Sequence, residues 1–200
     1  DDEQDGLWSY FSKDGSVAEE ITFSGGKRDG RSTVWLTPEE KQEEKFYRNG
    51  KLDGPSTFWE NGYRSTMTTY KSDSPEGPWV IWFSNSDQIK EQGFHQKGIR
   101  EGLTTYYYED GTMQREGFFK EGLPDGMWTY WNKKGEKDFD FDFGSGLQHI
   151  SLEDLVERES TFYKLGEDTP FTGIITQENP EADYLFLGRT KGGKKDGQWV

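Results

Sequence analysis

Residues 102–126 read GLTTYYYEDGTMQREGFFKEGLPDG. Two short runs rich in aromatic residues are separated by a turn at Gly111, and a second turn, from Gly122 to Gly126, closes the stretch. Short runs of Tyr, Phe and Thr bounded by Gly, Asp and Lys are typical of β-strands joined by tight turns. The stretch therefore predicts one β-hairpin unit, in the order strand, turn, strand, turn.

This unit recurs along the chain at an almost constant spacing, which indicates a repeat architecture. A second glycine stands four residues before most closing glycines, and Asp73 takes that place once; Asp tolerates the positive φ that such turns need. Because one hairpin cannot bury its own rings, neighbouring units must stack. We therefore predict that residues 1–146 form six tandem hairpins in an elongated, single-layer antiparallel sheet, closed by Gly6, Gly30, Gly54, Gly77, Gly102 and Gly126.

Two aromatic columns follow the closing glycines, at the fourth and the fifth residue after each. Side chains alternate between the faces of a strand, so the two columns should lie on opposite faces. One column should form a thin core; the other is either a second layer of cross-strand stacking or an exposed stripe. Trp and Tyr often carry interface energy, so we predict that the fifth-residue column binds a partner. Its members are Trp35, Trp59, Trp82, Tyr107 and Trp131.

The pattern changes after Gly146. Ser151 followed by Asp154 resembles a helix start, and we expect a short helix at 152–159, the only one in the chain. We interpret 147–172 as a degenerate unit whose first strand became this helix, and 173–200 as the resumed repeat and C-terminal end. The alternative is a boundary between two repeat blocks.

The composition limits the possible partners. The net charge of −14 disfavours nucleic acid and anionic membrane lipid, and favours a protein partner with a basic surface. The absence of cysteine excludes disulfides and thiolate metal sites. No apolar run is long enough for a transmembrane helix. The chain begins at Asp1 rather than Met, and we expect a periplasmic protein or surface lipoprotein rather than a cytoplasmic protein.

No arrangement of residues indicates catalysis, a cofactor or a metal site. His95 and His149 have no evident nucleophile or acid partner in the sequence. Asp138, Asp140 and Asp142 resemble the opening of a calcium loop, but Phe143 and His149 stand where that loop needs Gly and Glu. We interpret the three aspartates as one face of a strand, and their binding of a cation stays open.

The stretch that begins Gly126-Met-Trp-Thr-Tyr-Trp and turns at Gly135, with the recurring Gly-x-x-Asp-Gly, resembles MORN repeats. It is more similar still to the MORN-repeat variant of the bacterial YwqK-like antitoxin family, and residues 164–173 look like the lead-in to that family's repeat blocks. The resemblance implies an elongated, curved antiparallel sheet and a protein that binds and neutralises a toxin. It supplies no catalytic residue.

Together these observations predict a non-catalytic protein-binding repeat protein, an antitoxin or immunity protein that grips a toxin with one face of its sheet. Two alternatives from other classes are a cell-surface glycan-binding protein, because sugars stack on aromatic rings beside carboxylates, and a structural scaffold extended by repeat stacking. The sequence leaves the oligomeric state open.

Overall fold

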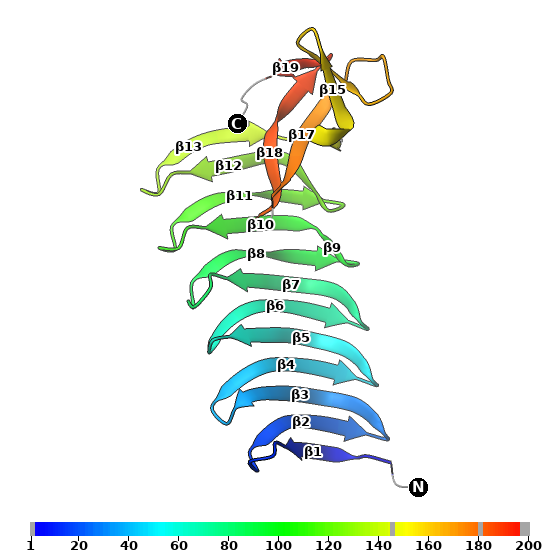
Figure 1. The fold of residues 1–200 in the computed structure, drawn as a ribbon, viewed down its shortest axis with the longest axis vertical. Coiled ribbons are helices and arrows are strands. Elements are labelled where there is room, and N and C mark those ends of the chain that lie inside the picture. The colour runs from blue at the N-terminus through cyan, green and yellow to red at the C-terminus, as the bar shows by residue number, and fades with distance from the viewer. Residues whose placement is uncertain (1–2, 145–146, 180–181, 197–200) are drawn as a thin grey trace.

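The computed structural model describes residues 3–144, 147–179 and 182–196. Its main feature is a long sheet of consecutive hairpins in which nearly every strand pairs with its neighbours in sequence, always antiparallel (Figure 1). This confirms the predicted fold class. The thirteen strands are β1 (Gly6–Phe11), β2 (Val17–Ser24), β3 (Lys27–Thr37), β4 (Glu40–Arg48), β5 (Lys51–Glu60), β6 (Tyr63–Lys71), β7 (Ser74–Trp82), β8 (Ile89–Gln96), β9 (Ile99–Arg100), β10 (Gly102–Tyr107), β11 (Met113–Lys120), β12 (Leu123–Trp131) and β13 (Lys137–Asp142).

The turns between units adopt the left-handed backbone that their sequence predicts. At the turn before β7, Ser72 has φ 50° and Asp73 has φ 71°. Two consecutive positive φ values characterise the type I′ turn, whose twist matches that of the flanking strands. The N–H of Asp73 donates to the carbonyl of Leu52 at 2.9 Å, and Gly98 bonds Pro75 in the same way one repeat later. Asp73 therefore keeps the backbone hydrogen bond of this turn, and its carboxylate adds a second one by accepting from the N–H of Leu52 at 2.8 Å.

Each hairpin contains a β-bulge close to its turn. In the β5–β6 hairpin, Phe58 lies opposite Thr66 and Trp59 lies opposite Arg64, so Ser65 is the extra residue. The same shift occurs between Tyr106 and Tyr107 in the β10–β11 hairpin. The bulge thus falls at the same place in successive repeats.

The sheet has a core face and an outer face. The core face carries Trp79, Tyr106 and Trp128, all of which are buried. Glycine is required where the largest rings lie flat against the neighbouring strand. A Cβ on Gly117 would stand only 2.2 Å from the Trp128 ring, and one on Gly93 would stand 2.8 Å from Trp79. At these two positions a buried tryptophan ring thus packs directly against the backbone of a glycine.

A second sheet packs on the core face at the end of the long sheet (Figure 1). Its strand order is β14 (Gln148–Ser151), β17 (Gly173–Asn179), β18 (Ala182–Lys191) and β19 (Lys194–Asp196), and β14 pairs with β17 in parallel. Ile174 of β17 is fully buried against Tyr106, Phe119 and Trp128. The core of the last repeats is thus completed by the C-terminal sheet. The division of the chain at 146 and 172 stays a prediction, and Gly146 and residues 197–200 lie outside the described residues.

The helix expected at 152–159 is wrong. Only the 3-10 turn η1 (Leu152–Asp154) forms, and the chain continues as β15 (Leu155–Arg158), which pairs with β16 (Thr161–Lys164). The Ser151 side chain does not cap the turn. A helix of eight residues is marginal by itself, because nucleation costs more than so few hydrogen bonds return. The extended form lets Leu155 pack against the buried cluster of Phe162, Phe171 and Ile175.

In the part of the chain that the structure describes, no helix has the length and apolar character needed to span a membrane.

Candidate partner-binding site

The five predicted rings lie in one column on the outer face, near the bulged ends of the hairpins. Trp82 is buried, with 8% of its surface exposed. The other four, Trp35, Trp59, Tyr107 and Trp131, are half-buried. The structure therefore brings the predicted residues together, as their position in the repeat requires.

Cationic side chains cover several of these rings. The Lys41 ammonium lies 5.8 Å from the centre of the Trp35 ring and 5.5 Å from that of Trp59, so it bridges two repeats. The Arg64 guanidinium lies 4.8 Å from the Trp82 ring centre. These distances are typical of cation–π contacts, which stabilise the sheet itself.

Polar contacts tie the same column to its neighbours. Lys41 also pairs with Glu44 at 2.7 Å, and Gln92 donates to the Tyr107 hydroxyl at 2.9 Å. The rings of this column are thus partly covered and held by side chains of the sheet, and they do not form an uncovered aromatic stripe. Its role in partner binding stays a prediction.

A second, more exposed group of apolar residues lies on the outer face, which the sequence reasoning missed. Its four members are 44–57% exposed. We call it the apolar patch, and it consists of Phe94, Leu103, Phe118 and Met127. Leu103 and Phe118 are direct cross-strand partners. Large apolar side chains gathered on one exposed surface are uncommon except at interaction sites.

A sequence signal for this patch exists. Leu103 and Met127 immediately follow closing glycines, and Phe94 and Phe118 stand eight residues before the next ones. Both positions are occupied by apolar residues in consecutive repeats only in this part of the chain. Counting these two columns as well as the fifth-residue column would have identified the patch.

The seam between β8 and β10 hollows the surface beside the patch. These strands pair at only two positions, Thr105 with Gln92 and Tyr106 with Glu91. The resulting hollow has a volume of about 550 Å³, and Phe94 and Leu103 line it. A hollow between two exposed apolar residues can receive a side chain of a partner.

Carboxylates surround the apolar patch on the same face. Glu116 lies opposite Thr105, Asp125 opposite Phe118, and Asp142 opposite Met127. Asp140, opposite Thr129, is held by Lys137 at 2.6 Å. That hydrogen bond and a second one from Thr129 lower the pKa of Asp140, so it stays ionised at neutral pH. The surface therefore combines apolar anchors with a rim of negative charge.

Asp140, Asp142 and the two histidines make contacts within the protein. Among the described residues, no group of three or more His, Asp or Glu side chains could hold a metal ion. Asp140 is engaged by Lys137, and Asp142 accepts a hydrogen bond from the N–H of Gly144 at 2.8 Å. His95 packs against Trp79, with ring centres 5.6 Å apart, and His149 stacks on Phe143.

Comparison with protein families identifies the repeat. Residues 4–24 and 100–121 match the MORN repeat variant. These two segments of the long sheet are therefore similar to MORN repeats. The matched segments fall on the β1–β2 and β10–β11 hairpins, so one MORN repeat corresponds to one hairpin. No curated protein matches the chain.

Proposed function

We propose that the protein is a non-catalytic MORN-repeat protein that binds and neutralises a cognate toxin with a basic surface, as an antitoxin or immunity protein does. MORN repeats are generally non-enzymatic, which favours binding over catalysis. The resemblance of the repeat sequence to the YwqK-like antitoxins supports the choice of a toxin as partner.

The observation that carries the proposal is the apolar patch with its carboxylate rim. The patch provides Leu103 and Phe118 side by side at the centre, and Glu116 and Asp125 lie next to them. Apolar anchors at the centre of an interface with charged groups around them are the usual arrangement of a specific binding surface. The rim selects a basic partner and speeds its association by electrostatic attraction.

The charge of the whole chain supports the same partner. At −14, two copies of the protein repel each other, as do the protein and any other anionic macromolecule. A basic protein is attracted by the same negative charge. We therefore assign the toxin, rather than a second copy, to the outer face.

The experiment co-expresses this chain, or a variant, with the product of each gene that neighbours its own, and takes as the toxin a product that stops growth when it is expressed alone. Leu103→Lys places a like charge at the centre of the interface and should abolish growth protection and weaken binding in surface plasmon resonance by about a hundredfold or more. Leu165→Lys is the matched control, because Leu165 is also an exposed leucine, at 71% compared with 48% for Leu103.

Two results would contradict the proposal. One is growth protection that survives Leu103→Lys as well as it survives Leu165→Lys. The other is an association rate that does not fall between 50 mM and 200 mM salt, since steering by exposed charges is screened over that range.

A further inference from the structure

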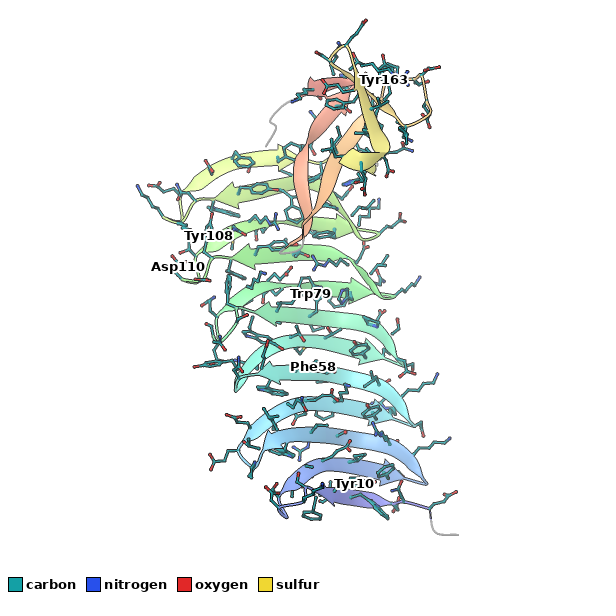
Figure 2. All side chains as sticks on the ribbon, viewed as in Figure 1. Tyr10, Phe58, Trp79, Tyr108, Asp110 and Tyr163 are labelled. Carbon is teal, nitrogen blue, oxygen red and sulfur yellow. The ribbon has the colours of Figure 1, made fainter. Side chains whose placement is uncertain are left out.

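A hollow of about 730 Å³ lies at the hairpin-turn end of the sheet, and both Tyr106 of the core face and Tyr107 of the outer face line it. Three cross-strand neighbours, Glu91, Tyr106 and Arg115, form part of its wall. Figure 2 shows Tyr108 and Asp110, which also line it, at the side of the sheet away from the C-terminal strands. The hollow has the size of a small-molecule site, and none of the four residues of the apolar patch lines it.

The aromatic walls of this hollow are specific to two adjacent repeats. Phe83 and Tyr108 occupy the same place in the repeat, six residues after Gly77 and Gly102, and both line the hollow. The other repeats have non-aromatic residues there, namely Ser12, Leu36, Glu60 and Asn132. The repeat pattern alone therefore does not account for these two rings.

Two tyrosines position the Arg115 side chain in this hollow, and no described carboxylate forms an ion pair with it. Its guanidinium stacks on the Tyr106 ring at 4.0 Å and bonds to Tyr130, whose pKa is raised because burial disfavours the phenolate. Within the described residues, no carboxylate forms an ion pair with Arg115 or with Lys133. Lys133 lies near enough to Asp110 for its charge to help lower the pKa of that carboxyl group, whereas Arg115 has no such acidic neighbour in the described part of the chain. In a chain with a net charge of −14, a guanidinium of this kind in a hollow indicates an anionic ligand.

The same hollow contains groups that need hydrogen-bond donors. Glu109 and Asp110 line it, and Asp110 stays ionised because the N–H and hydroxyl of Thr112 lower its pKa. The Gln114 amide adds a donor and an acceptor. A ligand that carried only negative charge would be repelled by these carboxylates, so it must also bring hydroxyl or amine donors.

We propose that this hollow binds an acidic saccharide. The sugar carboxylate is bound by Arg115 and Lys133, the apolar face of the sugar ring packs on Phe83 and Tyr108, and the hydroxyls donate to Glu109 and Asp110. A saccharide acid is the ligand class that combines an anion, a flat apolar face and several hydroxyl donors. The inference does not rest on toxin binding, because no residue of the apolar patch lines this hollow.

Isothermal titration calorimetry on the 200-residue chain tests it with trigalacturonate as the acidic probe and maltotriose as the neutral one. We expect saturable heat with trigalacturonate that weakens as salt rises, and at least tenfold weaker binding of maltotriose. Arg115→Gln should weaken trigalacturonate binding about tenfold, since it removes a charge-assisted, bidentate contact.

Lys133→Gln keeps the test decisive if Arg115→Gln disturbs the fold, because Lys133 is exposed and lies in a turn. Its matched control is Lys134→Gln, the next residue, which does not line the hollow. Weaker binding for Lys133→Gln alone supports the proposal. No heat at millimolar trigalacturonate, equal binding of maltotriose, or equal losses for the two lysine variants would overturn it.

Discussion

The carboxylate of Glu76 accepts a hydrogen bond from the backbone N–H of Lys97, 2.7 Å away in the next repeat. Lys97 has φ 52° and opens the tight turn before Gly98. Asp29 makes the same contact with the N–H of Asn49 at 3.0 Å, and Glu101 makes it with that of Glu121 at 2.9 Å. Each acid stands immediately before a closing glycine, so part of the acidic composition stabilises the stacking of repeats.

Glu76→Ala should therefore lower the free energy of unfolding by about 1 kcal/mol, because the N–H of Lys97 loses its acceptor. Urea denaturation measures the change. Glu39→Ala is the control, since Glu39 is an exposed carboxylate for which no such contact is found. Equal midpoints for the two variants would show that this contact does not stabilise the turn.

Gly117→Ala should destabilise the protein by about 2 kcal/mol or more, because the new methyl group overlaps the Trp128 ring. Gly15→Ala separates this clash from the backbone effect. Gly15 has φ 86° with open space around it, so its replacement should cost only about 1 kcal/mol of conformational strain. Thermal unfolding followed by near-ultraviolet circular dichroism compares the two. A cost for Gly117→Ala no larger than for Gly15→Ala would mean that Trp128 can move aside.

Lys41→Met keeps the apolar stem of the side chain and removes its charge. The variant loses the contacts of the ammonium with Trp35, Trp59 and Glu44, so we expect its free energy of unfolding to fall by about 1 kcal/mol. Lys13→Met, in an exposed turn, should change the stability by much less. The two variants are compared by urea denaturation at low salt. An unchanged midpoint for Lys41→Met would show that the ammonium group does not stabilise this column of rings.

Protonation of His149 should destabilise the fold in mildly acidic solution. Burial disfavours the imidazolium and lowers the pKa of His149, and this outweighs a hydrogen bond to Pro124 and the charge of Asp125, which act in the opposite direction. The unfolded chain then binds the proton more readily than the folded one. The stability that the fold has with a neutral His149 is therefore fully present above the unfolded pKa of about 6.5, and it is lost as the pH falls below that value.

His149→Gln isolates this effect. Between pH 7.5 and pH 5.5 the melting temperature of the wild type should fall more steeply than that of the variant, measured by differential scanning calorimetry. The carboxylates whose pKa is lowered, Asp14, Asp110 and Asp140, titrate below this window. Parallel curves would contradict the assignment.

The fold was predictable because its information is local and repeated. The spacing of the closing glycines defines the turns, and the alternation of side chains within each strand assigns Tyr106 and Tyr107 to opposite faces. The region around Ser151 was not predictable in this way. Its local pattern favours a helix, but the pairing of β15 with β16 and the packing of Leu155 decide for strands.

The candidate sites, too, could be predicted from the sequence only in part. The sequence places Trp59 and Trp82 on the outer face, but their exposure depends on Lys41 and Arg64 from neighbouring strands. The hollow between Phe94 and Leu103 lies where β8 and β10 pair at only two positions. The sequence by itself thus determines the repeat, its turns and the face of each ring. The tertiary structure decides which rings are covered, because cover comes from side chains that meet only when separate hairpins stack.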